Sequence, residues 1–130
     1  MAKTSMNLDE NIAGFLCYLG VWLTGIIFYL MEKDNKTVRF HALQSFLTFL
    51  PLTILGAIFT MVGSTTTITY TQTAYGNFPS GVSQPFIVLW YIGWVIYIIM
   101  IILWLILMIK AYQGEKFKVP VVGDIAEKHA

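Results

Sequence analysis

Three long apolar runs without a single charged residue constrain this chain more than any other feature. They cover residues 12–31, 42–62 and 86–109. A helix rises about 1.5 Å per residue, so about 20 residues cross the hydrocarbon core of a bilayer. Barrel strands would be shorter and would alternate in polarity. The runs therefore predict an all-α fold, an integral membrane three-helix bundle that forms a single membrane domain over residues 1–130.

Composition argues against a soluble protein with the same helices. Charged residues make up 12% of the chain, whereas soluble domains carry about 25%. A soluble bundle would also need amphipathic helices to cover the apolar runs, and the sequence has no segment left for them. The net charge of +1 comes without a basic patch, so a nucleic-acid partner is not expected. Membrane lipids are the expected surroundings.

The first run could be mistaken for a cleaved signal peptide. Such a peptide needs positive charge just before its apolar core. Here Asp9 and Glu10 precede the run, and Lys3 is the only basic residue before it. The apolar core is also too long, so we expect a retained helix.

The distribution of Lys and Arg predicts an orientation. Three spans would put the N-terminus and the loop 63–85 on one side, and the link 32–41 and the tail 110–130 on the other. Seven of the eight basic residues lie in the link and tail, and Lys3 is the exception. The positive-inside rule then predicts a multi-pass cell-membrane protein whose N-terminus is outside and whose C-terminus is cytoplasmic.

The loop 63–85 is polar yet contains no charged residue. Its TTTITYTQT stretch has the β-branched, alternating character of a strand, and TAYGNFPSG is typical of turns. Both a short hairpin and a flexible loop are compatible with this pattern.

Small and polar residues indicate how the helices could pack, because hydrophobicity alone does not join helices in lipid. In the first run, small residues at steps of four, three and four form a narrow seam. They are Ala13, Cys17, Gly20 and Thr24. On the second helix, polar residues gather on one side. His41, Ser45 and Thr48 share a face, and Gln44 lies beside them. We expect the seam and the polar side to meet.

Further candidate interaction residues lie on the second helix. Arg39, at the cytoplasmic end of this helix, is either a topology anchor or a ligand for lipid phosphate, for acidic tail residues or for Glu32. His41 titrates near neutral pH, but no second His or Cys lies at ligand spacing, so a hydrogen bond between helices is expected there rather than a metal site. Pro51 predicts a kink, either a static bend or a hinge.

Motifs of catalysis are missing from the sequence. It contains no glycine-rich phosphate loop, no GxSxG and no HExxH. None of the three runs has an ionisable Asp, Glu, Lys or Arg, which membrane catalysts and proton-coupled carriers usually need at depth. We therefore expect no enzyme, no catalytic residue and no cofactor.

Three segments of the chain read AGFLCYLGVWLTGIIFYL, MEKDNKTVRFHALQSFL and IKAYQGEKFKVPVVGDIAEK. On these segments the chain resembles a widespread prokaryotic family of small three-span membrane proteins whose function is unknown, and the resemblance extends over most of the chain. That family is similar in turn to the polytopic channel subunit of the chloroplast Tic import translocon, on Val38, Arg39, Phe40, Gln44 and loosely Ala42. The Tic subunit is read as having four spans, whereas three are expected here.

Three functions are compatible with these features. The first is a small membrane protein that acts by association, as a homo-oligomer or as an accessory subunit of another membrane protein, related to translocation or membrane-complex assembly. The second is an oligomeric pore or carrier for ions or small solutes, with Ser and Thr of the second helix as its lining. The third is a lipid-binding envelope protein.

Overall fold

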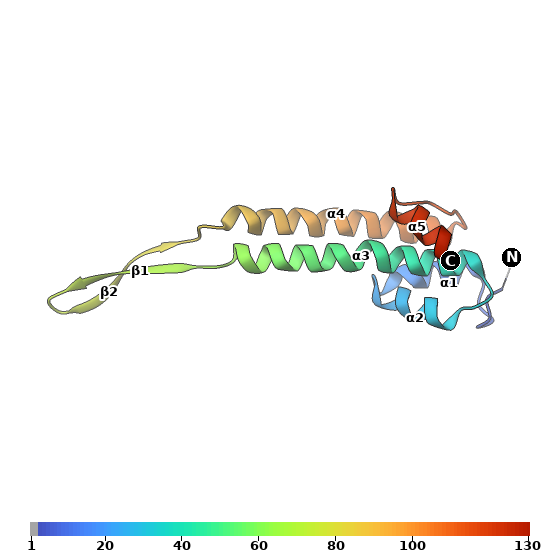
Figure 1. Cartoon of the computed structure of the whole chain (residues 1–130), viewed down its shortest axis with the longest axis horizontal. Coiled ribbons are helices and arrows are strands. Elements are labelled where there is room, and N and C mark those ends of the chain that lie inside the picture. The colour runs from blue at the N-terminus through green and yellow to red at the C-terminus, as the bar shows by residue number, and fades with distance from the viewer. Residues whose placement is uncertain (1–2) are drawn as a thin grey trace. The chain divides into compact units, whose positions relative to one another are not determined.

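The computed structural model describes residues 3–130, and within them the chain forms five helices and one two-stranded sheet (Figure 1). It divides into two compact units. The first unit runs up to Leu52 and resumes at Ile99–Ala130, and the second unit is Thr53–Ile98. The elements are α1 (Glu10–Leu19), α2 (Leu23–Met31), α3 (Lys36–Gly63), β1 (Thr67–Thr73), β2 (Gly76–Ser83), α4 (Ile87–Tyr112) and α5 (Val122–His129).

The predicted all-α three-helix bundle is wrong. Within residues 3–130, only α3 and α4 are long and apolar enough to cross a membrane, and the loop between them contains β structure. Only 22% and 11% of the most apolar windows of α3 and α4 are buried in the protein. Such exposure is unlike that of the core helices of a soluble protein, and it fits helices that face lipid.

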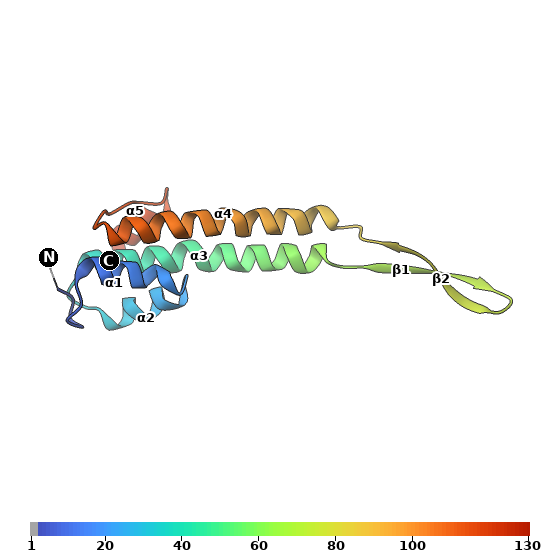
Figure 2. The same cartoon turned by 180° about the vertical axis from the view of Figure 1, so that it is seen from behind.

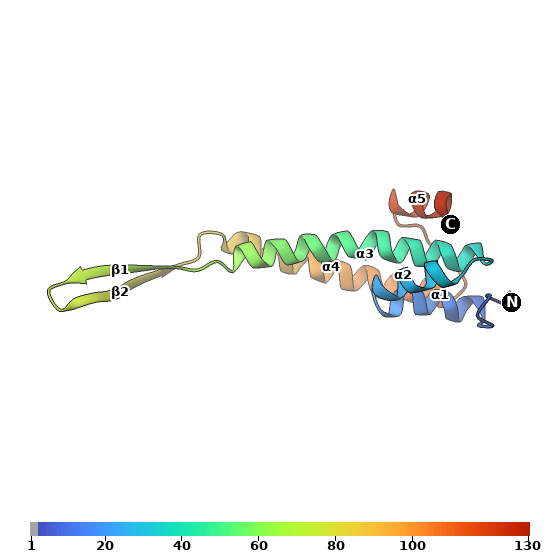
Figure 3. The same ribbon diagram turned by 60° about the horizontal axis from the view of Figure 1, so that its bottom comes forward.

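The first apolar run differs most from the prediction, because it is broken into α1 and α2. Gly20 ends α1, and Val21 has a φ of 62°, a left-handed conformation that disrupts a helix and is rare for a β-branched residue. With ten and nine residues, each helix is only about 15 Å long, half of what a span needs. Figures 1 and 3 show the two as neighbouring antiparallel helices.

Hydrogen bonds join the two ends of the α1–α2 hairpin. The backbone N–H of Ser5 donates to the Glu32 carboxylate at 3.0 Å, and the Asn35 side chain donates to the Glu10 carboxylate at 2.8 Å. The chain therefore enters and leaves this hairpin at the same end. The prediction that the N-terminus and the link lie on opposite sides of the membrane depended on a first helix that spans, so it loses its basis.

The core of the first unit lies where α1, α3 and α4 meet. Tyr18, Phe49, Leu107 and Ala111 form one buried cluster there. A second buried cluster joins α1 to the start of α3 and consists of Ala13, Cys17, Val38 and Ala42. Helix α3 continues through Pro51 as one helix, so the hinge at this residue remains a prediction.

The second unit consists of the facing ends of α3 and α4 and the hairpin between them. A Cβ on Gly63 would lie 2.1 Å from the backbone nitrogen of Trp90, and one on Gly93 would lie 2.9 Å from that of Thr60. Glycine at these positions therefore lets the two helix backbones approach closely.

Of the two alternatives for the loop, the structure has the hairpin. Strands β1 and β2 pair antiparallel from Thr67 opposite Ser83 to Thr73 opposite Gly76. The register shifts between Thr69 and Tyr70, where Tyr70 faces Pro79, a residue that strands tolerate at such irregularities. The segment expected to be turn-like therefore contributes most of β2.

Gly25 supplies a test of the packing of α2 on α3. A Cβ at this position would lie 2.7 Å from the backbone oxygen of Ala42 and 2.7 Å from Ser45 Oγ. We expect Gly25→Ala to destabilise the fold by about 1–3 kcal/mol, because the helices must move apart. The midpoint of thermal unfolding in detergent measures this effect. Gly14→Ala is the comparison variant. Its Cβ would meet the His41 side chain at 3.2 Å, a longer distance and not a backbone atom, so its loss of stability should be smaller. An equal loss in both variants would contradict the account.

Candidate functional site: a polar cluster at the broken helix

Side chains from three helices bind the carbonyl groups around the break. Ser45 Oγ lies within hydrogen-bond distance of the carbonyl oxygens of Cys17, at 2.9 Å, and of Val21. Thr24 Oγ1 donates to the Cys17 oxygen at 3.1 Å and accepts from the N–H of Gly20 at 3.0 Å.

Helix α4 takes part through a tryptophan. Trp104 Nε1 donates to the carbonyl oxygen of Tyr18. An unsatisfied backbone group costs several kcal/mol inside a bilayer. Donors from α2, α3 and α4 therefore stabilise the break, and Trp104 adds to the N–H of Val21 that the Tyr18 oxygen also accepts.

A second set of polar contacts lies next to the break and holds the tail. The Tyr18 hydroxyl is 3.1 Å from His41 Nδ1 and accepts a hydrogen bond from Gln44 Nε2 at 3.0 Å. Gln44 also donates to the carbonyl oxygen of Phe117 at 3.0 Å and accepts from the N–H of Val119 at 3.2 Å. The amide of Gln44 thus binds the extended tail as a neighbouring strand would.

The structure brings together most of the residues predicted to form an interface. Cys17 Sγ lies 3.8 Å from the carbonyl oxygen of Val38, and Cys17 O accepts from Ser45, so the seam of α1 faces the polar side of α3. Ala13 is buried in the same cluster. Thr48 is also buried, but its hydroxyl has no hydrogen-bond partner among the described residues. Pro51 is exposed and takes no part in this cluster.

Arg39 does not pair with a carboxylate in the described part of the chain. Its Nη1 donates to the backbone oxygens of Glu32 at 2.8 Å and Tyr29 at 3.4 Å, and its guanidinium carbon lies 4.5 Å from the centroid of the Tyr29 ring. The backbone oxygens belong to the end of α2, where a cation is favourable. The predicted alternatives of pairing with the Glu32 carboxylate or with acidic tail residues are not seen.

Glu32 is buried and binds backbone N–H groups instead. Its carboxylate accepts from Ser5, Asp34 and Asn35. Burial raises the pKa of this carboxyl, but these hydrogen bonds outweigh it, and the net pKa lies below the usual value.

Several residues of these contacts, Gly25 and Trp104 among them, were not predicted from the sequence. Gly25 stands outside the regular steps of the seam, and only its close approach to α3 reveals its role. The position of Trp104 in the sequence could have indicated such a role. A tryptophan deep in an apolar run departs from the usual preference of this ring for the water–lipid boundary.

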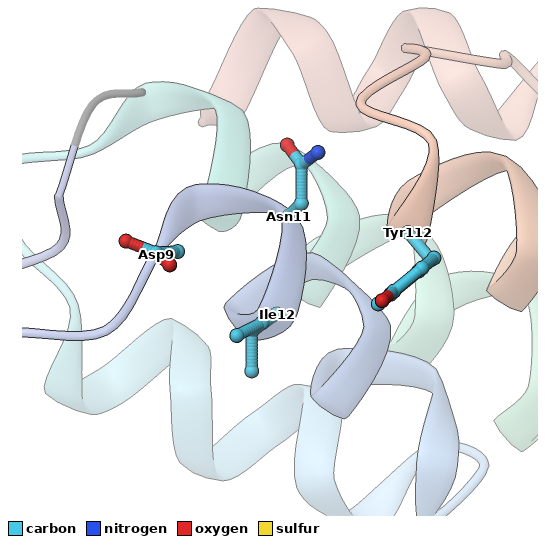
Figure 4. A pocket seen from close by; sticks show the side chains of 4 residues that line it. All are labelled: Asp9, Asn11, Ile12 and Tyr112. Carbon is cyan, nitrogen blue, oxygen red and sulfur yellow. The ribbon is translucent and has the colours of Figure 1, made fainter.

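A pocket of about 360 Å³ lies at the N-terminal end of α1 (Figure 4) and is lined by Asp9, Asn11, Ile12 and Tyr112. In Figure 4 the carboxylate of Asp9 points away from the other three side chains. The polar groups therefore do not converge on one ligand. Within residues 3–130, no group of three His, Cys, Asp or Glu side chains could hold a metal ion.

Comparisons with known proteins identify relatives along nearly the whole chain. The family model described as "Magnetosome magnetite crystal formation protein family" matches residues 3–126. Two UPF0132 membrane proteins of Methanocaldococcus jannaschii are 42% and 41% identical to this chain, over 100% and 96% of its length and 96% and 73% of theirs. A UPF0132 membrane protein of Archaeoglobus fulgidus is 36% identical over 93% of this chain and 95% of its own. No solved structure matches.

Two hydroxyl groups on the same side of α3 should respond in opposite ways to removal. Ser45→Ala leaves the Val21 oxygen without its hydroxyl donor and the Cys17 oxygen with the Thr24 hydroxyl alone, and we expect a loss of about 1–3 kcal/mol in the free energy of unfolding. Thr48→Val removes a buried hydroxyl that has no partner, so it should be neutral or stabilising. Denaturant or thermal unfolding in detergent measures both. Destabilisation by Thr48→Val as large as that by Ser45→Ala would refute this assignment.

The lowered pKa of Glu32 predicts a loss of stability in acid. Because the folded pKa lies below that of the unfolded chain, the contribution of Glu32 is fully present above about pH 4.3. It is lost as the pH falls through the lowered folded pKa. The fraction folded, measured from pH 7 to pH 3, should therefore fall less steeply for Glu32→Gln than for the native chain. Identical slopes would show that this carboxylate does not contribute.

Proposed function

This chain belongs to the magnetosome magnetite crystal formation protein family, and we propose that this membrane protein acts by assembling with further copies of itself. The family description names crystal formation, and the named relatives are membrane proteins. Among the possible functions, self-assembly is the one that the residues of this chain support most directly.

The observation that carries the proposal is the β1–β2 hairpin. The sheet has two strands, so each strand has one unpaired edge (Figure 2). A two-stranded hairpin is marginally stable by itself in water, and a free edge is a template for pairing with another chain. Natural proteins protect such edges with charged residues, especially Lys, but residues 64–86 contain none.

The side chains of the hairpin support the same interpretation. Tyr75 is 93% exposed, Val82 69%, Tyr70 63% and Phe78 51%. Large apolar and aromatic side chains on a short ribbon are typical of surfaces that become buried on association. Pairing of identical, uncharged edges would bury them without electrostatic repulsion.

The charge distribution supports an orientation for this assembly. Every Lys, Arg, Asp and Glu lies outside residues 40–109. If α3 and α4 each cross the membrane once, the segments before α3 and after α4 share one side, and the positive-inside rule makes that side cytoplasmic. The hairpin would then associate on the opposite side of the membrane.

The other functions have less support. Ser45 was a candidate lining residue for a pore, but it donates to the backbone of α1 within the first unit. A role in translocation depends on the Tic resemblance alone. Association with a different membrane protein, as an accessory subunit, would use the same hairpin and would appear in the experiment below as a complex of mixed composition.

A charge on the edge strand tests the proposal. We expect Thr69→Lys combined with Thr71→Lys to shift the protein from oligomer to monomer, because like charges would face each other across the joined edges. Native mass spectrometry from nanodiscs, or photobleaching of labelled copies, counts the chains per particle. Thr65→Lys combined with Thr66→Lys is the control, because both residues precede β1. A native chain that is monomeric in nanodiscs, or an oligomer that the strand variant leaves unchanged, would overturn the proposal.

A further inference from the structure

We propose that a groove between α2 and α3 binds one phospholipid with an anionic headgroup, its acyl chain in the groove and its phosphate on Arg39. The groove has a volume of about 270 Å³ and belongs entirely to the first unit. It is lined by Ile26, Tyr29, Leu30, Leu43 and Phe46.

The lining of the groove is suited to hydrocarbon. All of its residues belong to the two charge-free runs 12–31 and 42–62. The one polar group among them, the Tyr29 hydroxyl, donates to the carbonyl oxygen of His129 at 3.3 Å. Leu30 is 68% exposed, so the groove is open at its side, where a bilayer would supply acyl chains.

Arg39 is placed at the polar end of the same groove. Along α3, residues 39, 43 and 46 follow at steps of four and three and therefore share one face of the helix. The Arg39 guanidinium also lies over the ring of Tyr29, with 4.5 Å between its carbon and the ring centroid. Since residues 40–109 have no charge, Arg39 marks the level at which the apolar part of α3 begins.

The hydrogen bonds of Arg39 leave donors available for a phosphate. A guanidinium has five N–H donors in a planar fork, and the bonds to Tyr29 and Glu32 both use Nη1. No carboxylate lies within ion-pair distance of Arg39 in residues 3–130, so its charge has no acidic partner among these residues. Phosphate oxygens fit the fork of an arginine in a bidentate manner.

Charge complementarity favours a lipid over a second copy of this chain as the occupant. A second copy would present apolar helix surface, or a link and tail whose five acidic residues are outnumbered by seven basic ones. The acidic residues of the tail already pair with lysines, and Glu32 binds backbone N–H groups. A lipid supplies an anionic group and an apolar chain in the order in which Arg39 and the groove are arranged.

Native mass spectrometry of the full chain, with added phosphatidylglycerol or phosphatidylcholine, tests the proposal. We expect one phosphatidylglycerol to remain bound to the native chain, and a weaker phosphatidylcholine adduct because choline offsets the phosphate charge. Arg39→Gln should weaken phosphatidylglycerol binding about tenfold, since a hydrogen-bonded charge is removed. Arg39→Lys should bind with intermediate strength because it retains the charge without the fork.

Two controls distinguish binding in the groove from nonspecific attraction to positive charge and from nonspecific contact with apolar surface. Lys128→Gln removes one exposed positive charge from α5 and should leave the adduct unchanged. Leu43→Trp fills the groove while retaining Arg39 and should weaken the adduct, whereas Leu55→Trp, at another exposed position of α3, should not. Equal losses in Lys128→Gln and Arg39→Gln would overturn the proposal. A dimer that Leu43→Trp dissociates would also overturn the proposal, because the groove would then bind a second copy of the chain.

A measurement on the native chain keeps the test decisive if Arg39→Gln fails to fold. Phosphatidylglycerol with a photoreactive group in its acyl chain should label Leu30, Leu43 or Phe46 more strongly than Ile98 and Ile102, which are exposed positions of α4. Equal labelling at both places would mean that lipid contacts the groove as it does any other apolar surface, and the proposed site would be rejected.

Discussion

The hydrogen bonds to the carbonyl groups at the end of α1 are the interaction on which the rest of the structure depends. A chain that stops being helical inside an apolar environment must find donors for its free carbonyl groups, because water is not there to supply them. Ser45 and Thr24 provide donors to the Cys17 oxygen, and Trp104 adds a donor to the Tyr18 oxygen, which also accepts from the N–H of Val21. Each comes from a different helix, so satisfying the break also fixes how α2, α3 and α4 pack around α1.

This break changes the topology of the whole molecule. With the first apolar run folded back as a hairpin, α3 and α4 are the candidate spans. If both helices cross the membrane, the link, both terminal segments and every charged side chain lie on one side of it, and Lys3 is then no exception to the distribution of basic residues. Glu32 contributes to this arrangement, because its carboxylate joins the residues before α1 to those after α2.

Sequence reasoning identified the membrane character and gave the charge-free hairpin as one of two alternatives for the loop 63–85. Of the residues expected to meet between the first two runs, Cys17 and Ser45 are in contact, whereas Thr24 belongs to α2. Sequence reasoning failed at Gly20–Trp22, because length and hydropathy are the same for one helix of twenty residues and for two of about ten. The break depends on donors such as Ser45 and Trp104, which lie 28 and 86 residues away from their acceptors. Long-range contacts of this kind leave no local pattern. The roles of Gly25 and Arg39 likewise depend on what the neighbouring helix places beside them.

Labelling of single cysteines with a membrane-impermeant maleimide tests the returning α1–α2 hairpin most directly. With the buried Cys17 replaced by alanine, cysteines introduced at Ser5, Tyr75 and Lys128 can be compared in intact and in permeabilised cells. The account predicts that Ser5 and Lys128 share one side, with labelling only after permeabilisation, and that Tyr75 is labelled from outside. Labelling of Ser5 together with Tyr75, and not with Lys128, would mean that the first run crosses the membrane and would contradict the account.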